Sequence, residues 1–458
     1  MTRDMTQGKP LKQILLFCFP LLMGSLFQQF YNLADSILVG KLLGVEAFAA
    51  VGSTGSLSFL VLGFAQGICS GFAIPLAQSF GAGNEAAVRR RCGQIIWLSL
   101  LFSVLLTVLT FFTTEWILRL VRTPEDIFAD AYRYIFIVFM GTGATILYNM
   151  VSWVLRSLGD SRTPLYFLIA AVAVNVGLDI LLMGPVGMGV DGAAIATVAS
   201  QAAAGLGCLL YIRCRMPMLH LRRQDLRPNL REMLRIAGIG VPMGLQFSIT
   251  AIGSIVLQSA VNSLGKGAVA AISAGFKVEY LLAAPMESAG LTMATYCGQN
   301  LGAGKLDRIR KGVRQITLVA MVYCVAAFTI NFFWGTTIAS LFIDASEVEI
   351  LAQARHYLIV SGLCYPALAI IFVYRNSLQG MGFSSSAMLA GAAELAARAI
   401  AAFCLTAPLG YAGVCMGPPL AWIFADCILL PLYFIKTRQV QRRMAVYDAY
   451  QTKQDTPR

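Results

Sequence analysis

Charged residues are scarce in this chain, and histidine is almost absent. Of the 458 residues, 13% are charged, and only His220 and His356 are histidines. A soluble domain usually has about a quarter of its residues charged, so most of this chain is expected inside a membrane. Two histidines are too few for a histidine-based metal centre. The eleven cysteines include no CxxC pair, which argues against zinc and disulfide roles and favours ordinary packing.

Motifs of catalysis and of nucleotide binding are also missing from the sequence. HExxH and GxSxG do not occur, and no paired Ser/His set stands out. Gly304-Lys305 looks like the end of a phosphate-binding loop, but Leu306 replaces Ser or Thr and Gln299 replaces the first glycine. The sequence therefore predicts a protein that is not an enzyme, has no cofactor, and uses an energy source other than ATP.

The chain is rich in long apolar runs. Hydrophobic residues make up 57% of the sequence, and the mean hydropathy is +0.70. Apolar stretches of about 20 residues are long enough to cross a bilayer as helices. The sequence predicts an all-α membrane protein with spans near 13–39, 46–77, 92–114, 131–155, 164–184, 190–212, 233–261, 268–298, 313–341, 356–378, 386–407 and 412–435.

The two halves of the chain repeat one another at a distance of about 221 positions. Gln78-Ser-Phe-Gly-Ala-Gly83 returns as Gln299-Asn-Leu-Gly-Ala-Gly304, and Leu43-Gly44 returns as Leu264-Gly265. Duplicated apolar halves are typical of secondary transporters. Six spans per copy predict two lobes related by a pseudo-two-fold axis along the membrane normal. The predicted domains are an N-terminal lobe 1–212, a basic linker 213–232, a C-terminal lobe 233–436 and a tail 437–458.

The basic residues predict how the chain is oriented in the membrane. The net charge of +12 is carried by short loops on one side, which points to the cytoplasm. Both termini and the 213–232 linker are therefore expected to be cytoplasmic, in the inner or plasma membrane of the cell. The linker is interpreted as a positive-inside tether; lipid binding or RNA binding is the alternative, and we expect no nucleic-acid partner. The basic groups are Arg3, Lys9, Lys12, Arg89–Arg91, Arg156, Arg162, 213–235, 305–314 and the tail from Lys436.

Polar residues occur inside the first span, where they are costly. Gln28, Tyr31, Asn32 and Asp35 recur every three to four residues, so they share one helix face. A carboxylate at membrane depth marks an ion or proton site more often than a lipid-facing position. Pro20 removes a backbone donor in the same span and is expected to bend it.

A second polar group lies in the fifth and sixth spans. Asn175 and Asp179 are four residues apart on one face, and Thr197 stands among small residues in the next span. Together with Asp35 they form a set of hard oxygen ligands that suits H⁺ or Na⁺. The second copy has no acid at the position of Asp35, so this site is predicted in the first lobe alone.

The second copy has intramembrane charges of its own. Glu279 and Glu287, with Met286 between them, either line a substrate cavity that attracts cations or pair internally with Lys277. Glu394 and Arg398, at i and i+4, are interpreted as a buried structural salt bridge. Asp426 has no role that the sequence indicates.

Several motifs together resemble the multidrug and toxic compound extrusion (MATE) family, over nearly the whole chain. They are Pro20 with Gln28-Gln-x-Tyr-Asn-Leu-Ala-Asp35, the two Gly-Ala-Gly segments, Leu155-Arg-Ser-Leu-Gly-Asp-Ser-Arg-Thr-Pro164, and Leu378-Gln-Gly-Met-Gly382. The resemblance implies twelve helices in two lobes that open alternately to each side. It also implies export of organic, often cationic compounds in exchange for H⁺ or Na⁺.

The DinF-like branch of that family fits the sequence best. Its cation site in the N-terminal lobe carries over to Asp35, Asn175, Asp179 and Thr197, and its bending proline carries over to Pro20. The branch with a Na⁺ site in the C-terminal lobe places a glutamate shortly after the proline of the seventh span. Here that neighbourhood is Pro242-Met-Gly-Leu-Gln246, so a second cation site is not expected.

The leading interpretation is therefore a cation-coupled exporter of drugs or metabolites. A flippase for lipid-linked precursors, of the same superfamily, is the alternative; it would favour additional spans and a basic cavity. The expected partners are a small organic substrate and the lipid bilayer, and the protein is expected to be a monomer. The sequence leaves open whether H⁺ or Na⁺ is the coupling ion and which compound is exported.

Overall fold

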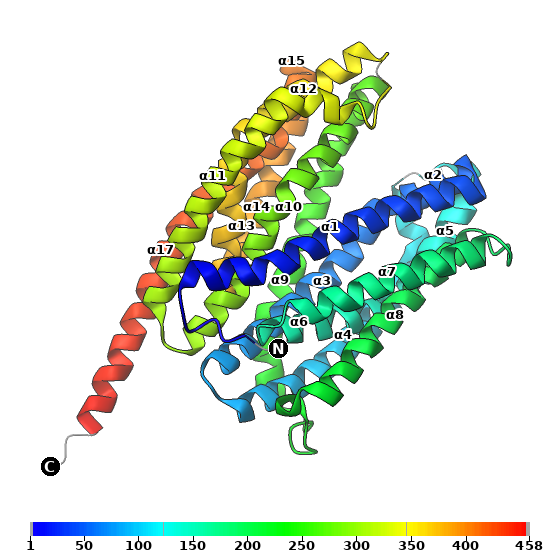
Figure 1. Cartoon of the computed structure of the whole chain (residues 1–458). Helices are drawn as coiled ribbons and strands as arrows, with labels where there is room; N and C mark the ends of the chain where they lie inside the picture. The colour runs from blue at the N-terminus through cyan, green and yellow to red at the C-terminus, as the bar shows by residue number, and fades with distance from the viewer. Residues whose placement is uncertain (1–2, 122, 345, 455–458) are drawn as a thin grey trace. The chain divides into compact units, whose positions relative to one another are not determined.

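The computed structural model describes residues 3–121, 123–344 and 346–454. Over these ranges the chain forms helices joined by short turns, and it contains no strand (Figure 1). Ten helices are long and apolar enough to cross a membrane, and two further spans are pairs of helices with a sharp bend. The predicted all-α class with twelve spans is confirmed.

The helices of the first half follow the predicted spans closely. The exceptions are the second predicted span, which is divided into α2 and α3, and the fourth, which is the bent pair α5 and α6. The bounds are α1 Pro10–Leu43, α2 Val45–Ser53, α3 Gly55–Gly81, α4 Glu85–Leu120, α5 Glu125–Met140, α6 Thr142–Ser157, α7 Arg162–Met183 and α8 Val190–Arg215.

The second half repeats this order after a one-turn helix, η1, at Pro217–Leu219. Its tenth span is again a bent pair, and its eleventh span ends in a short π-helical segment, η2. The bounds are α9 Leu230–Ser263, α10 Lys266–Gly302, α11 Leu306–Ala339, α12 Val348–Leu363, α13 Tyr365–Gly380, α14 Ser384–Ile400, η2 Ala401–Leu405, α15 Thr406–Leu409, α16 Tyr411–Cys415 and α17 Gly417–Gln454. The predicted tail from 437 continues α17, and residues 455–458 lie outside the described residues.

The two bends stand at matching places in the two copies and have local causes. The α5–α6 pair is bent by 47° and the α12–α13 pair by 51°. Gly141 separates the first pair; a Cβ there would lie 2.2 Å from the side chain of Val198 in α8, so only glycine permits this approach. Pro366 lies in the first turn of α13, where it cannot continue the hydrogen bonds of α12.

The turns also preserve the repeat in their backbone angles. Gly44 and Gly265 have φ of 91° and 95°, and Gly83 and Gly304 have φ of 68° and 71°. Angles in this region are strained for side chains other than glycine. The glycines that the sequence repeats are therefore required by identical turns, which explains why both copies carry them.

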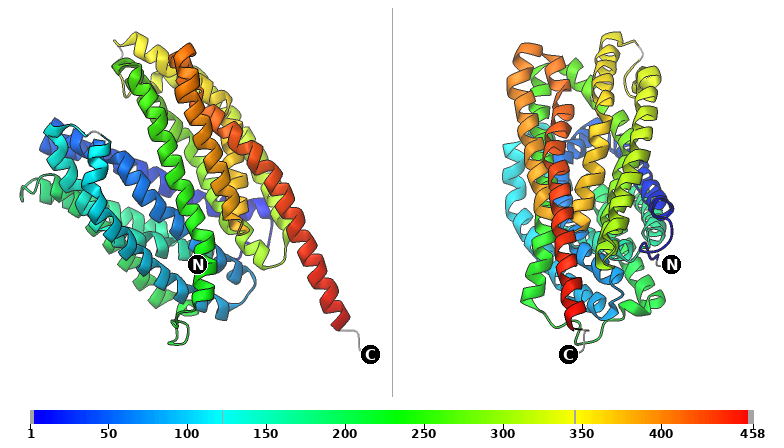
Figure 2. Two further views of the ribbon diagram at one scale, coloured as in Figure 1. Left: turned by 180° about the vertical axis from the view of Figure 1, so that it is seen from behind. Right: turned by 90° about the vertical axis from the view of Figure 1, so that its left-hand side faces the viewer.

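Contacts divide the described chain into two compact units. The first unit consists of Arg3 with Phe19–Phe80 and Asn84–Ala251, and the second of Asp4–Cys18, Gly81–Gly83 and Ile252–Gln454. Within the first unit α7 packs along α8, and within the second α14 packs along α17 (Figures 1 and 2). The lobe boundaries expected from the sequence, 1–212 and 233–436, stay a prediction. Helix α1 passes from the second unit to the first between Cys18 and Phe19, directly before Pro20.

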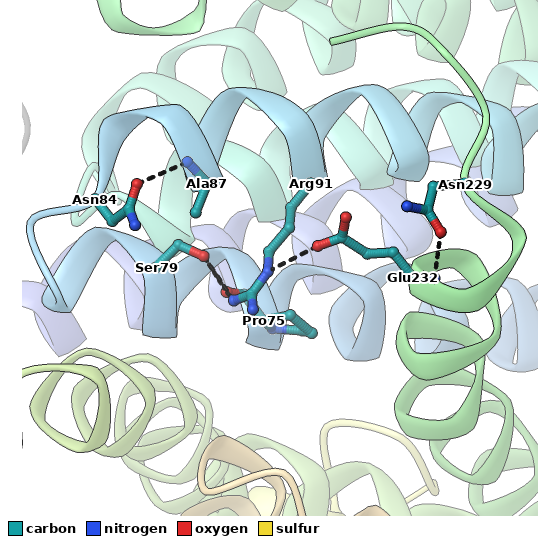
Figure 3. Close-up of polar contacts among 7 residues, drawn as sticks. All are labelled: Pro75, Ser79, Asn84, Ala87, Arg91, Asn229 and Glu232. Carbon is teal, nitrogen blue, oxygen red and sulfur yellow. Dashed lines mark hydrogen bonds and ion pairs between the residues drawn. The ribbon is translucent and has the colours of Figure 1, made fainter.

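An arginine fastens three helices of the first unit together (Figure 3). The guanidinium of Arg91 in α4 donates to the carbonyl of Pro75 and to the hydroxyl of Ser79 in α3, both at 2.6 Å. It also pairs with Glu232 in α9 at 3.3 Å. The α3 carbonyl and hydroxyl are held by a charged donor that reaches them from a neighbouring helix, which makes these hydrogen bonds stronger than neutral ones.

We expect Arg91→Ala to destabilise the protein by about 2 kcal/mol, since hydrogen bonds to charged groups contribute about 1.5–3 kcal/mol. Thermal unfolding in detergent measures this loss. Arg89→Ala is the matched control on the same helix, because Arg89 pairs only loosely with Glu85, at 3.6 Å. The control should lose at most about 0.5 kcal/mol. Equal losses in the two variants would show that Arg91 does not hold the three helices.

Candidate functional site

The predicted polar residues of the first, fifth and sixth spans lie on α1, α7 and α8, and each of these residues belongs to the first unit. Helices α7 and α8 approach closely because α8 begins with small residues. A Cβ on Gly192 would lie 3.1 Å from Leu182 in α7. The alanines that follow Gly192 are buried. The small residues therefore allow α7 and α8 to pack closely along one another.

The carboxyl groups of Asp35 and Asp179 lie within hydrogen-bonding reach of one another at this site. Asp179 is fully buried, Asn175 is 1% exposed, and Asp35 is half-buried. Both carboxyl oxygens of Asp179 and Oδ1 of Asp35 are enclosed, and none of them accepts a hydrogen bond from a donor in the described part of the chain. Two ionised carboxylates cannot bond to each other, because neither can donate.

An enclosed carboxylate without a donor is costly, and a buried anion has to be compensated. A proton shared between Asp35 and Asp179 would make one of them a donor. A small cation between them would compensate both charges. The side-chain amide of Asn175, whose oxygen and nitrogen are also buried and unpaired among the described residues, lies one helical turn before Asp179. These enclosed oxygens are suited to a proton or a hard cation.

Tyr31 connects α1 to α8 beside the two acids. Its hydroxyl lies 3.3 Å from the hydroxyl of Thr197, and either group can donate. Tyr31, which the sequence placed in the substrate cavity, also interacts electrostatically with Asp35 and Asp179. The joint role of Asp35, Asp179 and Thr197 stays a prediction.

One residue near the acids escaped the sequence-based prediction. Tyr134 of α5 is 9% exposed, belongs to the apolar core of the first unit, and interacts electrostatically with Asp35, Asp179 and Tyr31. Its position within the apolar stretch Tyr134-Ile-Phe-Ile-Val-Phe139 indicates packing and nothing more. Because its hydroxyl is the polar end of a buried ring, it adds a donor to the surroundings of the two acids.

The other residues of the α1 face lie toward the surface of the unit. Asn32 is exposed and Gln28 is half-buried, and the amide of Gln28 donates to Asn32 at 3.5 Å. Their placement on an accessible face of the helix stays compatible with contact to a substrate. Their role stays a prediction.

In the second unit, the acids of α10 have different surroundings. Glu279 accepts a hydrogen bond of 2.6 Å from Tyr357 in α12, whereas the ammonium of Lys277 lies 5.0 Å from the ring centre of Phe342. Glu279 therefore has a tyrosine as its partner in place of Lys277. Glu287 is half-buried, and Met286 is 2% exposed. The substrate cavity predicted from these three residues stays a prediction.

The predicted pair of Glu394 and Arg398 is present, with a nitrogen–oxygen distance of 3.7 Å, and it has a third member. Arg375 of α13 pairs closely with the other oxygen of Glu394. All three residues are buried, with exposed fractions of 3% for Glu394, 8% for Arg375 and 9% for Arg398. Asp426 of α17, 8% exposed, interacts electrostatically with Arg375. The sequence did not indicate that Arg375 belongs to this ion pair, because a single arginine near the end of a span is usually interpreted as an interfacial residue.

Twelve spans in two similar halves, with two neighbouring acids inside one half, define a multi-pass membrane transporter. The family model described as MatE matches residues 20–181 and 242–404. The chain therefore belongs to the MatE family, and the resemblance noted in the sequence is confirmed. The two matched segments correspond to the two copies of the repeat.

Named relatives are similar to this chain in sequence, and a solved structure has a similar fold. The chain is 30% identical to the "Probable multidrug resistance protein YpnP" of Bacillus subtilis (strain 168), over 94% of this chain and 96% of that protein. It is 26% identical to an "FAD transporter" of Shewanella oneidensis, over 81% of this chain and 82% of that protein. A structure described as the outward-facing conformation of a multidrug resistance MATE family transporter of the MOP superfamily has a TM-score of 0.88. That match has 20% identity and covers 96% of this chain and 99% of the other.

Proposed function

We propose that this protein is an antiporter that exports organic compounds and is driven by the entry of H⁺ or Na⁺. The ion binds between Asp35 and Asp179, and Asn175 and Thr197 complete its surroundings. The observation that carries this proposal is the pair of neighbouring acids, whose enclosed oxygens receive no donor from the described residues. A small cation compensates the negative charge of these acids. Its binding and release therefore change the packing of α1 against α7 and α8.

Pro20 has a place in this cycle. It lies two residues after the point where α1 leaves the second unit, and the proline ring removes one hydrogen bond from the helix at that point. A weakened turn between two compact units allows the Asp35 segment to move with the first unit. Ion binding biases the populations of two packings, and these correspond to openings on opposite sides of the membrane.

The proposed substrates are small organic compounds, with organic cations first among them. The half-buried Glu279 and Glu287 of α10 supply negative charge that attracts cations. The named relatives include both multidrug resistance proteins and an FAD transporter, so an anionic flavin belongs in the test panel beside organic cations. The lipid-linked-precursor flippase is not favoured, because the described residues form twelve spans and no additional ones.

The proposed location is the cell membrane, inner or plasma, with both termini in the cytoplasm. Basic residues concentrate at the ends of spans that share one side, as the positive-inside rule requires. A monomer suffices for the proposed mechanism, because one chain carries both units and the ion site.

Transport into proteoliposomes tests the proposal. Purified protein is reconstituted, and a pH gradient or a Na⁺ gradient is imposed separately while uptake of a fluorescent organic cation or of FAD is followed. We expect one of the two gradients to drive uptake and its dissipation by an ionophore to stop it. The proposal fails if uptake of every compound is the same with and without either gradient.

A further inference from the structure

The basic linker between the halves is packed firmly against α4 of the first unit. The side chain of Gln94 donates to the carbonyl of Arg227 at 2.9 Å and accepts from the backbone N–H of Asn229 at 2.8 Å. The indole of Trp97 donates to the carbonyl of Leu226, also at 2.8 Å. A Cβ on Gly93 would lie 2.0 Å from the carbonyl oxygen of Asp225, so the linker backbone rests directly on the helix.

The docked linker closes one side of an apolar pocket of about 640 Å³. Its walls come from α4, α6 and α8, with Ile95, Val151 and Leu209 as examples, and the linker contributes Leu219 and Leu221. Ile96 and Leu209, which also line the pocket, are 39% and 41% exposed. Since outward-facing apolar residues of membrane helices meet lipid chains, the pocket is accessible from the bilayer.

The polar lining of this pocket is basic. Arg213, at the C-terminal end of α8, and His220 of the linker both line it, and both are exposed. The Nε2–H of His220 donates to the carbonyl of Arg213 at 2.7 Å, which fixes the imidazole beside the end of α8. The guanidinium of Arg213 has no hydrogen bond or ion pair to any residue in the described ranges.

The surrounding linker adds charge of the same sign. Residues 213–235 contain seven arginines and two acids. The carboxylate of Asp225 accepts from the backbone N–H of Arg222 at 2.9 Å, and Glu232 is paired with Arg91. A basic cluster next to membrane-spanning helices attracts anionic lipids of the adjoining leaflet.

We propose that this pocket binds one anionic glycerophospholipid from the leaflet at the linker side. An acyl chain lies along the apolar walls of α4, α6 and α8, and the headgroup phosphate is bound by Arg213 and His220. The bound lipid fastens the linker to α4 from the outside, in addition to the hydrogen bonds of Gln94 and Trp97. This site is independent of the ion site and of the transported compound.

The test is lipid binding by the full-length protein in detergent, measured by native mass spectrometry and by the shift of the unfolding temperature. Phosphatidylglycerol and phosphatidylcholine of equal chain length are titrated separately. We expect phosphatidylglycerol to bind about fivefold more tightly, since one arginine near an anionic headgroup is worth about fivefold in affinity. Arg213→Gln with His220→Gln should remove this preference.

Two further variants separate the site from general surface charge. Arg223→Gln removes an exposed arginine of the same linker that does not line the pocket, and it should leave the lipid preference unchanged. Leu209→Trp fills the pocket from its exposed side and should abolish binding of both lipids. The proposal is overturned if the two lipids bind equally to the parent protein. It is also overturned if Arg223→Gln matches the double variant, or if a transported organic cation displaces the lipid from the pocket.

Discussion

Asp35→Asn and Asp179→Asn should each abolish uphill export while leaving downhill movement of the substrate measurable. Asparagine has nearly the shape of aspartate, but it carries no charge to exchange for an ion. In a one-for-one exchange, a gradient of one pH unit supports about tenfold accumulation of substrate, because 1.4 kcal/mol corresponds to a factor of ten. For an uncoupled variant, the ratio of substrate concentration inside to that outside should stay at about one.

Accumulation ratios in proteoliposomes at a fixed ion gradient measure this effect. Glu115→Gln is the matched control, since Glu115 is an exposed acid of α4 in the same unit and is paired only with Arg119 at 3.0 Å. The control should keep the parent ratio. If Asp35→Asn accumulated as much substrate as the control, the acids would not take part in coupling.

Glu394→Gln should have the largest effect on stability. Glu394 is the common partner of Arg375 and Arg398, and all three side chains are buried. Removing the carboxylate takes away the anion that the two buried guanidinium groups share, and Asp426, which interacts with Arg375 electrostatically, does not replace its close contacts. Breaking a buried ion pair in this way costs about 3–5 kcal/mol. The protein is therefore expected to unfold at a markedly lower temperature in detergent and to express poorly.

A second variant distinguishes unpaired charge from lost packing. The double variant Glu394→Gln/Arg398→Met removes the acid together with one of its two cationic partners. It should therefore recover part of the stability that Glu394→Gln loses. Thermal unfolding of the single and double variants in the same detergent gives the comparison. If the double variant is less stable than Glu394→Gln, the stability loss of Glu394→Gln does not come from the positive charges of Arg375 and Arg398.

The architecture could be predicted from the sequence because membrane spans and turn glycines have strong local signals. A run of about 20 apolar residues has few alternatives to a spanning helix. Gly44 and Gly265 mark the same turn in both copies because only glycine readily adopts its backbone angle. The bends at Gly141 and before Pro366 were not predicted, since glycine and proline also occur in continuous membrane helices.

The site was predictable only where polarity stood out against an apolar background. Asp35, Asn175 and Asp179 are conspicuous for that reason, and the structure brings the two acids together. Tyr134 and Arg375 were missed, because a tyrosine in an apolar stretch and an arginine near the end of a span have ordinary explanations. The linker is held on α4 by the side chains of Gln94 and Trp97, which bond to backbone groups of the linker. Hydrogen bonds to the backbone do not depend on the residue type of the partner, so the sequence does not indicate them.

The most direct test of the ion site is to count ions released when substrate binds to the purified protein. Release of H⁺ is followed with a pH indicator in weakly buffered detergent solution, and release of Na⁺ with ²²Na⁺ after equilibration. We predict that the parent protein releases one of the two ions on binding, and that the Asp35→Asn/Asp179→Asn double variant releases none. Substrate binding without release of either ion from the parent protein would contradict the claim that a cation occupies the space between these two acids.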